Sequence, residues 1–511
     1  MIGWVSSVVL SVLSWLFSPL PLAVLAVLFV CVYFYVTRHF DFWRSRGVLG
    51  PTARFPWGTE MGPPFMTPFV TFEEWLYYEK GGKNFCGYFE LSLPVLYVGN
   101  LDLIQRITIK DFEYFTDRRE LLLTEEFDEM LQVLNGKTWK DTRSVMSPTF
   151  SSSKLKIMHE LCLENASNLN KYVQDEMKKS GELEIKDCFG RFTMDNIASC
   201  AFGVNCNSFK DPNCEFAKNA EELFKAPRGY SGFRLLLILL FGLGSVRLLP
   251  DPFARINAFF KHVVKSAVRQ REAGNSRKDF LQLLLDTKDK DGKRILSDSS
   301  IISQSVLFLI VGYDTTASLL AFAAYCLATS PDVQNAAHRE IDDVLQRHDG
   351  QLTYDAVAEM TYLDRVLSET LRLYPPAIRM ERQCSRDYTL PDTNVHIPRG
   401  TTVQMPILNI HRDPEHYPDP LRFDPDRFLP EAKEERHPCA FVPFGSGPRN
   451  CIAMRFALFE AKVALIAVLR ENRLEPSKRT PPPPMPLDED KFLLTPKKGM
   501  GYLRAVSREQ R

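Results

Sequence analysis

The stretch Phe444-Gly445-Ser446-Gly447-Pro448-Arg449-Asn450-Cys451-Ile452-Ala453 places one cysteine at the end of a loop rich in glycine and proline. Apolar residues then recur at the spacing of one helical face, namely Ile452, Phe456, Leu458 and Ala461. The pattern therefore predicts that Cys451 lies at the N-terminus of a helix, where amide donors and the helix dipole favour a thiolate. Glycines let backbone amides approach the sulfur closely. A thiolate in this setting is suited to binding a metal.

Two neighbours of the cysteine extend this interpretation. Phe444 can cover the sulfur and exclude water, and Arg449 brings a cation to the loop for an acidic group on whatever the sulfur binds. The alternative is a structural cysteine in a glycine turn. The combined spacing of phenylalanine, glycines, arginine and cysteine favours the metal ligand.

These residues resemble the signature Phe-x-x-Gly-x-Arg-x-Cys-x-Gly of the cytochrome P450 family, the haem-thiolate monooxygenases. Ala453 departs from it, because the family usually has glycine there. The resemblance implies haem b bound by Cys451, Phe444 and Arg449, with Cys451 as the iron ligand that favours O–O bond cleavage. Between Leu371 and Leu469 the likeness to the microsomal drug- and steroid-oxidising branch, family 3, is nearly continuous.

Further haem contacts follow from the resemblance. Trp139 and Arg143 are four residues apart, hence on one helical face, and alone they would be a cation packed on an indole. In the family, such a pair contacts a haem propionate. Arg118 and Arg382 resemble two further propionate-binding cations of the same branch. Haem carries two carboxylates, so several converging arginines make physical sense.

An almost entirely apolar helix is predicted from Ile301 to about Ser330, with Asp298 as its cap and Pro331 beginning the next helix. The apolar run is interrupted by Gly312-Tyr313-Asp314-Thr315-Thr316. Burying these polar groups in a core costs free energy unless they serve a function. The interruption is either a packing kink, in which threonine bonds back to the preceding turn, or a functional groove.

The resemblance implies an oxygen-binding groove at this interruption. Gly312 would leave room over the iron, and Asp314 with Thr315 would pass protons to bound dioxygen. Val311 departs from the small residue that is usual before the glycine, which narrows the predicted substrate pocket. Ala377 and Ile378 match a strand entry that lines the same pocket.

Glu369 and Arg372 are three residues apart on a helix that ends before Pro375-Pro376. Alone they would be a commonplace surface pair. With Arg427 downstream they resemble the family's buried Glu-Arg-Arg triad, which locks the region leading to the cysteine.

The N-terminus predicts a membrane anchor. Residues 1–37 contain no charged side chain, and this uncharged run is longer than the roughly 20 residues that a membrane-spanning helix needs. Pro19 and Pro21 divide them, so residues 22–36 with their flanks form the predicted span, and residues 2–17 form an interfacial or continued segment. A cleaved signal peptide is the alternative, which the long apolar run without a basic start disfavours. The cations that follow place the remainder in the cytosol, namely Arg38, Arg44 and Arg46.

Beyond the anchor, residues 38–65 form a predicted basic hinge rich in proline and glycine, and residues 66–511 form the catalytic domain. This domain is predicted to be mostly α with a minor β part, the cytochrome P450 fold. Two short strands are expected at 89–93 and 95–98. A second apolar block, 233–249, is either a core helix or a lip that dips into the membrane at the substrate entrance.

The composition bears on the class of function and on the cellular compartment. The 511 residues carry 63 Lys plus Arg and 63 Asp plus Glu, so global charge does not favour nucleic-acid binding. Eleven cysteines without a Cys-x-x-Cys pair fit a reduced, cytosol-facing domain.

No Walker loop occurs, and no Gly-x-Gly-x-x-Gly follows a strand, so a partner must supply electrons. The resemblance implies NADPH-cytochrome P450 reductase, with cytochrome b5 as a further partner, at the endoplasmic reticulum membrane. A basic patch for the reductase is predicted from Lys140, Arg143, Lys154, Arg455 and Lys462.

The predicted reaction inserts one oxygen atom into lipophilic substrates such as xenobiotics, steroids or fatty acids. The alternatives are a peroxide-rearranging isomerase on the same fold and a non-enzymatic haem sensor. The Asp314-Thr315 pair disfavours both, because neither needs proton delivery to dioxygen.

Overall fold

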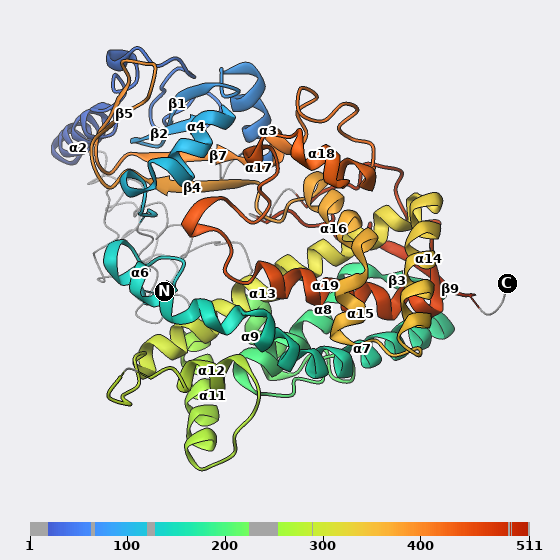
Figure 1. Ribbon diagram of the computed structural model, residues 1–511. Helices are drawn as coiled ribbons and strands as arrows, with labels where there is room; N and C mark the ends of the chain where they lie inside the picture. Colours follow the sequence, from blue (N-terminus) through green and yellow to red (C-terminus); the bar gives the residue numbers. More distant parts are fainter. Residues whose placement is uncertain are drawn as a thin grey trace, which may run out of the picture.

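The computed structural model describes residues 19–62, 67–119, 128–223, 254–288, 290–488, 491 and 493–508. Helices make up most of these residues and strands a minor part, which confirms the predicted fold class. Figure 1 shows most of the longer helices gathered in one part of the molecule, and the largest sheet with several shorter helices beside it in the other. The predicted segments 2–17 and 233–249 lie outside the described residues.

The long helices of the helical part enclose one apolar core. Their bounds are α6 Gly136–Met146, α7 Ser152–Ser180, α8 Ile185–Ile197, α9 Glu215–Leu223, α11 Ala254–Glu272, α13 Asp298–Thr329, α14 Pro331–Arg347, α16 Thr361–Leu373 and α19 Met454–Glu471. Shorter helices are α3 Phe69–Glu74, α4 Leu101–Gln105, α12 Phe280–Leu285, α15 Tyr354–Glu359, α17 Ile407–His411 and α18 Pro430–Glu434.

Helix α13 lies at the centre, because its nearly uncharged sequence can be buried on all sides. It packs against α8, α16 and α19. The predicted cap is wrong by one residue: the Ser297 side chain accepts a hydrogen bond from the Ser300 amide (3.0 Å). Asp298 is the first helical residue and pairs instead with Arg294 (2.9 Å). Pro331 begins α14, as predicted.

A four-stranded sheet has the order β1 (Phe85–Glu90), β2 (Leu93–Val98), β7 (Thr402–Pro406) and β4 (Arg379–Gln383). The predicted strand at 89–93 is wrong, because the chain turns inside it. Leu91 has φ 56 in the hairpin, where β1 pairs antiparallel with β2. The Leu91 side chain is nevertheless buried. The alternation of apolar residues therefore continues through the turn, and the sequence pattern did not show where the strand ends.

Strand β2 continues the sheet by pairing parallel with β7, and β7 pairs antiparallel with β4. A second sheet joins β3 (Leu183–Glu184), β9 (Tyr502–Ser507) and β8 (Asn472–Pro476), and β5 (Tyr388–Thr389) pairs with β6 (His396–Ile397). The parallel pairing brings residues some three hundred positions apart into one sheet, which carries Arg382 on β4 toward the cysteine loop.

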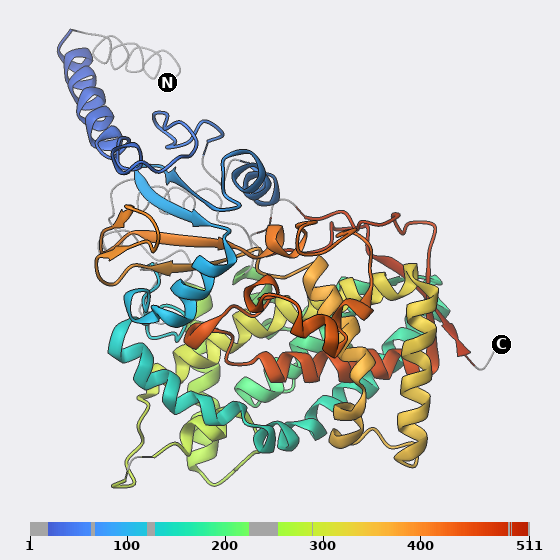
Figure 2. The ribbon, with the colours of Figure 1, turned by 45° about the horizontal axis from the view of Figure 1, so that its top comes forward.

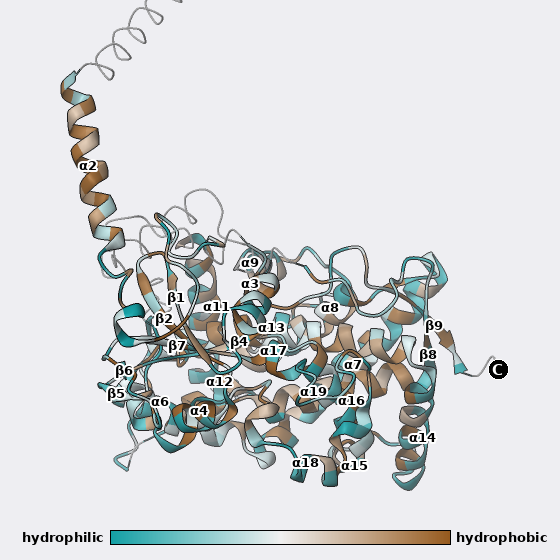
Figure 3. Ribbon diagram, turned by 90° about the horizontal axis from the view of Figure 1, so that it is seen from above, coloured by the Kyte–Doolittle hydropathy of each residue, from teal (hydrophilic) through white to brown (hydrophobic). Residues whose placement is uncertain are grey.

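Helix α2 (Pro19–Thr37) projects from the domain beside the four-stranded sheet (Figure 2) and is apolar along its length (Figure 3). Its 19 residues span about 28 Å, close to the thickness of a bilayer core. Almost all of α2 is exposed, whereas α13, the other long apolar helix of the described chain, is mostly buried. The ring of Phe55, in the predicted hinge, packs against Phe29 and Tyr33 on α2, with 5.8 and 5.2 Å between ring centroids.

Candidate functional site

The cysteine loop is closed by its own backbone. The Cys451 amide donates to the Phe444 carbonyl (2.8 Å), and the Asn450 amide donates to the Gly447 carbonyl (3.0 Å). Gly447 has φ 72, and a Cβ there would lie 1.7 Å from the Thr108 carbonyl oxygen, so only glycine fits. Helix α19 begins at Met454, three residues after the cysteine, in agreement with the sequence prediction.

Ala453 fits the loop without strain. Its φ of −95° and ψ of 13° are open to any L-residue, so the glycine usual at this position is not required here. Its backbone amide donates to the Cys451 sulfur, which is the close amide approach expected from the sequence.

Cys451 is accessible to solvent although protein surrounds it. That enclosure raises the pKa of its thiol, whereas the Ala453 amide, Arg143 and Arg118 lower it. Burial outweighs these donors, so the pKa of the thiol lies above its usual value. A bound metal ion would stabilise the thiolate.

Arginines converge on this loop from separate parts of the chain. From α6, Arg143 donates to the carbonyl and side-chain oxygens of Asn450 (2.7 and 2.9 Å). From β4, Arg382 donates to the Ser446 carbonyl (3.1 Å). Arg118 donates to the carbonyl of Arg449 (3.4 Å). Three predicted propionate cations thus contact the cysteine loop directly.

Arg449 completes the cluster from within the loop. Its guanidinium donates to the carbonyls of Thr116 (2.8 Å) and Leu134 (2.7 Å). It also lies over the ring of Trp139, 4.2 Å from the centroid. Trp139 is buried and therefore supports Arg449 by a cation–π contact, a partnership that sequence spacing did not reveal.

The arginines of this cluster form no ion pair with a carboxylate of the described residues, although Glu381 and Asp117 act on them at longer range. Burial together with Arg143 lowers the pKa of Arg118 to about 10, and burial with Arg118 and Arg143 lowers that of Arg449 to about 9. Burial and the charges of Arg118 and Arg449 also lower the pKa of Arg382. Within the described residues, no carboxylate forms an ion pair with any of these arginines.

Two buried guanidinium nitrogens of the cluster, Nε of Arg382 and Nη1 of Arg449, have no hydrogen-bond partner in the described chain. Unpaired buried cations and donors are costly, so the site is built for an anionic group. A flat cofactor with carboxylates at one edge and a metal at its centre fits both this cluster and Cys451.

Helix α13 contributes an accessible patch to the interior. Val311 is 40% exposed although most of α13 is buried. Thr315 follows one turn later on the same face, and its hydroxyl donates to the Val311 carbonyl (2.5 Å). This is the back-bonded arrangement that packing alone would give, and it leaves the hydroxyl oxygen free to accept a hydrogen bond. The helix runs unbroken through the polar interruption.

Gly312 faces α8 at close range. A Cβ at Gly312 would lie 2.9 Å from Cδ1 of Ile197, the end of a flexible side chain on α8. A small shift of this side chain would relieve the contact, so packing against α8 does not by itself require glycine. The room over the iron that the resemblance assigns to Gly312 stays a prediction.

Asp314 lies on a different side of α13 from Thr315, and it is tied to α8. Its carboxylate is 2.7 Å from the Lys186 ammonium, which also donates to the Asp314 carbonyl (3.0 Å) and to the Ser318 hydroxyl (2.9 Å). Sequence reasoning missed Lys186, because no local pattern links residues so far apart in the chain.

Glu369 and Arg372 are completely buried, so the pair does not lie on the surface. The guanidinium forms two hydrogen bonds to the carboxylate (2.7 and 2.8 Å). Arg427 Nε lies 3.6 Å from the same carboxylate. Glu369 also accepts from the Asp424 amide (2.9 Å), and Arg372 donates to the His411 carbonyl (2.8 Å). The three predicted triad residues are thus together and join several loops.

Ala377 and Ile378 lie between α16 and β4. The Ile378 carbonyl accepts from the amides of Ile407 (2.8 Å) and Leu408 (2.9 Å), and its side chain is buried, whereas Ala377 is half-buried. Their substrate contacts remain a prediction.

The predicted basic patch needs one correction. Lys462 is only 5% exposed, because it donates to the Met360 carbonyl (3.2 Å) and pairs with Asp364. Lys140 and Arg455 are exposed, and Arg143 and Lys154 are half-buried. The sequence alone did not show that the Lys462 side chain points inward.

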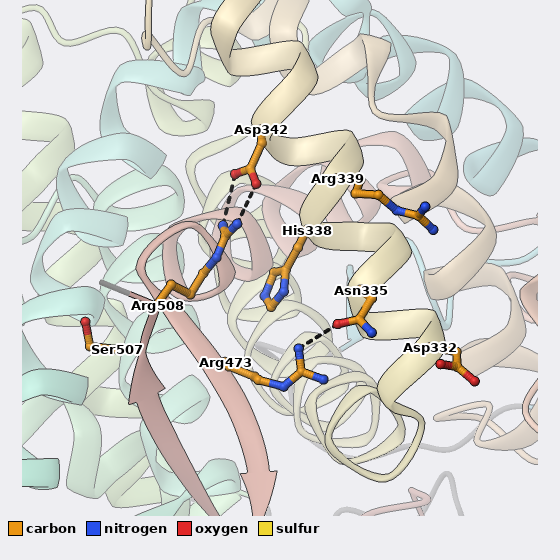
Figure 4. Close-up of a pocket in the computed structure, with 8 residues that line it drawn as sticks. All are labelled: Asp332, Asn335, His338, Arg339, Asp342, Arg473, Ser507 and Arg508. Atoms are coloured by element: carbon orange, nitrogen blue, oxygen red, sulfur yellow. Dashed lines mark hydrogen bonds and ion pairs between the residues drawn. The ribbon is translucent and has the colours of Figure 1, made fainter. Parts of the chain in front are cut away.

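A separate pocket lies between α14, β8 and β9 (Figure 4). Arg508 is paired there with Asp342, and Arg473 donates to Asn335 (2.6 Å). Arg473 follows α19, whose 18 residues place it about 27 Å from the helix start beside Cys451. The pocket is remote from the Cys451 thiol, so it is not the reactive site.

Comparison with known proteins agrees with this geometry. The family model for cytochrome P450 matches residues 72–501. The chain is similar to cytochrome P450 9e2 of Blattella germanica, with 36% identity over 501 residues that cover 90% of this chain and 93% of that protein. It is similar to cytochrome P450 3A41 of Mus musculus, with 35% identity over 494 residues, 91% of this chain and 93% of the relative. Cytochrome P450 6B6 of Helicoverpa armigera is 36% identical over 474 residues, 90% of this chain and 93% of that protein.

Proposed function

The chain belongs to the cytochrome P450 family, and from this premise we propose that it is a membrane-anchored enzyme that oxidises lipophilic substrates such as xenobiotics, steroids or fatty acids. It is a monooxygenase, and its cofactor is thiolate-ligated haem that receives electrons from NADPH through a reductase. The observation that carries the proposal is the accessible thiol of Cys451 beside a cluster of arginines that has no ion pair, and two unpartnered guanidinium nitrogens, within the described residues.

Haem held by a cysteine thiolate activates dioxygen, so that one oxygen atom can enter an unactivated substrate and the other leaves as water. Cys451 would be the iron ligand, and the Ala453 amide would hold negative charge on its sulfur. Arg118, Arg143, Arg382 and Arg449 would bind the propionates and so fix the edge of the cofactor.

Proton delivery is assigned to α13. Because the Thr315 hydrogen is directed to Val311, its oxygen is free to accept a hydrogen bond from a water molecule near the reacting oxygen. Asp314 would exchange protons with water after it leaves Lys186, or through Lys186 itself. Val311 would form part of the substrate boundary, since it is the most exposed apolar side chain of this helix.

The electron donor is proposed to be NADPH-cytochrome P450 reductase, with cytochrome b5 as a second donor. The exposed cations Lys140 and Arg455, with Arg143 and Lys154, would steer an acidic partner to the cysteine side. Helix α2 would anchor the enzyme in the endoplasmic reticulum membrane, with Arg38, Arg44 and Arg46 on the cytosolic side.

The experiment uses the full-length haem protein in vesicles with the reductase. Lipophilic compounds are screened for a shift of the haem spectrum, and compounds that shift it are then followed for NADPH consumption and oxygenated product. We expect product only with reductase, NADPH and dioxygen together. A rearranging isomerase would form product from a hydroperoxide without reductase, and a haem sensor would form none.

Cys451→Ser is the matched control, because a neutral hydroxyl is a poor ligand for ferric iron. The carbon monoxide adduct of the wild type should show the red-shifted Soret band of thiolate ligation. A variant that kept this band would contradict the assignment of Cys451.

A further inference from the structure

A pair of thiols lies in the loop between the helical turn η6 (Ala198–Phe202) and α9. The sulfur atoms of Cys206 and Cys214 are 2.8 Å apart, and both cysteines are reduced. They are eight positions apart in the sequence, so a search for Cys-x-x-Cys pairs does not find them. At this separation a small movement of the side chains would bring the sulfurs within bonding distance.

The backbone brings the two residues together by two successive turns. Asn207 has φ 53, and its carbonyl accepts from the amides of Lys210 (2.9 Å) and Asp211 (3.0 Å). The Asp211 carbonyl then accepts from the Cys214 amide (3.2 Å). The chain therefore reverses between the cysteines, so their contact follows from the fold of the loop.

The same loop is fastened to the helices behind it. The Ser208 amide donates to the Asp195 carboxylate (2.8 Å), and the Ser208 carbonyl accepts from Arg191 (3.0 Å), both on α8. The ring of Phe209 packs on Tyr172 of α7 (5.5 Å). Since the scaffold is anchored on both sides, the two sulfurs are held in position before any bond forms.

The two thiols differ in their surroundings. Cys214 is partly accessible, and its sulfur accepts from the Ala217 amide (3.4 Å) at the start of α9. Cys206 is buried, and burial raises the pKa of its thiol. Cys214 is thus the thiol that an oxidant reaches first, and Cys206 is the neighbour that can resolve the product.

We propose that Cys206 and Cys214 are a modification site at which a hydroperoxide forms a reversible disulfide. The Cys214 thiolate attacks one peroxide oxygen, the O–O bond breaks, and Cys214 becomes a sulfenic acid while hydroxide leaves. The Cys206 thiolate then attacks the Cys214 sulfur, the S–O bond breaks and a second hydroxide leaves, and the two protons that the thiols lost convert both hydroxides to water. In total, two thiols and one hydrogen peroxide give one disulfide and two waters, and a dithiol reductant reverses the change.

The source of the oxidant rests on the proposed function, because a monooxygenase that consumes NADPH without forming product releases hydrogen peroxide. The site itself does not depend on turnover. The disulfide would tie the start of α9 to the loop, where Phe216 already packs on Phe202 (5.2 Å) and Phe260 (5.4 Å). Because the sulfurs are already in contact, oxidation should leave this packing and the haem spectrum unchanged.

The test adds hydrogen peroxide in increasing molar ratio to the reduced, haem-loaded, full-length protein, without NADPH. Free thiols are alkylated, and the peptides are identified by mass spectrometry. We expect a linked peptide pair joining residues 206 and 214 and a mass lower by about 2 Da. Dithiothreitol should restore both thiols. The Soret band, measured in parallel, should not move, which separates this site from damage at Cys451.

Variants make the result decisive. In Cys206→Ser, Cys214 should stop at the sulfenic acid, which dimedone traps, and in Cys214→Ser, no adduct should form at Cys206. Cys188→Ser, at a buried cysteine on α8, should leave the linked pair unchanged. The proposal is overturned if Cys206 and Cys214 both remain alkylatable at a peroxide excess that oxidises other cysteines, or if either links to a different partner.

Discussion

Lys186 on α8 reaches across to α13 and holds Asp314, with 2.7 Å between the ammonium nitrogen and one carboxylate oxygen. The same ammonium donates to the Asp314 carbonyl and to the Ser318 hydroxyl, so all three of its protons have acceptors. Asp314 is only 7% exposed. The proposed proton donor is therefore not a freely hydrated carboxylate, and its availability depends on a residue of another helix.

Replacing Lys186 by methionine keeps much of the side-chain volume but leaves a mostly buried carboxylate without its cation. We expect a loss of stability on the order of 2 kcal/mol. The amount of product formed per NADPH should also change, because the Asp314 carboxylate would lose the ion pair that fixes its orientation. Thermal unfolding and product-to-NADPH ratios check this. Ser318→Ala removes one neighbouring acceptor and keeps the ion pair, so it should have a much smaller effect on both, and equal effects would speak against the ion pair.

Glu369→Ala should cost about 3 to 5 kcal/mol, because it leaves Arg372 as an unpaired charge in a fully buried position and weakens the hold on Arg427. Haem content and unfolding by denaturant are the measurements. The control is Asp426→Ala, which breaks a pair with Arg365 in which Asp426 is largely exposed, and it should cost at most about 1 kcal/mol. Similar losses in the two variants would mean that burial does not strengthen the first pair.

Glu460 on α19 predicts a pH dependence of stability. It is buried with a hydrogen bond from Asn196 (2.9 Å), and burial raises its pKa to about 8. The folded chain therefore keeps a proton that the unfolded chain loses near pH 4.5, so stability falls as pH rises from about 4.5 to 8. The slope from this group alone is at most about 1.4 kcal/mol per pH unit.

Glu460→Gln removes the titrating group and keeps an oxygen that can accept from Asn196. The variant should unfold with a flatter pH dependence and gain stability over the wild type at pH 8. Glu160→Gln, at an exposed position of α7, should leave the wild-type profile unchanged. Parallel profiles for wild type and Glu460→Gln would show that Glu460 is ionised in the folded protein.

The sequence predicted those features that local signals specify. The glycine loop at Cys451, the apolar run of α13 and the break before Pro331 each lie within a short stretch, so pattern and chemistry identify them. The errors at Ser297 and Leu91 are local as well. Ser297 and Asp298 are neighbours that can both cap a helix, so the sequence did not distinguish them. Leu91 lies in a turn, but its apolar side chain fits the alternating pattern of a strand.

The missed features depend on tertiary contacts. Lys186 with Asp314, Arg449 over Trp139, and Cys206 with Cys214 are pairs whose sequence separation carries no periodic signal. Lys462 shows the opposite failure, because a lysine is expected at the surface unless a buried acceptor is known. The sequence identified candidate site residues and the grouping of Glu369 with Arg372 and Arg427, but it did not reveal these other partners.

Deletion of residues 1–37 should release much of the protein from membranes, since it removes the exposed apolar helix α2. The predicted second contact at 233–249 should keep part of the protein peripherally bound. Fractionation at low and high salt, with haem content measured in each fraction, checks both statements. Complete solubility at low salt without detergent would remove the case for the second contact, and full retention would mean that α2 is not the main anchor.

Thr315→Ala separates proton delivery from packing. The change removes one hydroxyl and one methyl from α13, together with the hydrogen bond to the Val311 carbonyl, so the stability loss should be about 1 to 2 kcal/mol and haem should remain bound. Without the hydroxyl, no acceptor at this position holds the water molecule that would deliver the proton. NADPH oxidation should therefore continue while product falls several-fold and hydrogen peroxide rises.

The measurement is product and peroxide per NADPH consumed, in the same reconstituted vesicles for all variants. Thr315→Ser keeps the hydroxyl and should restore most of the wild-type ratio, although it lacks the methyl group. Thr316→Ala makes the same chemical change one residue later, at a buried position, and should lower stability without raising peroxide. If Thr315→Ala instead kept the wild-type ratio, the back-bonded hydroxyl would be explained by helix packing alone, because a bond to Val311 is all that the structure requires of it.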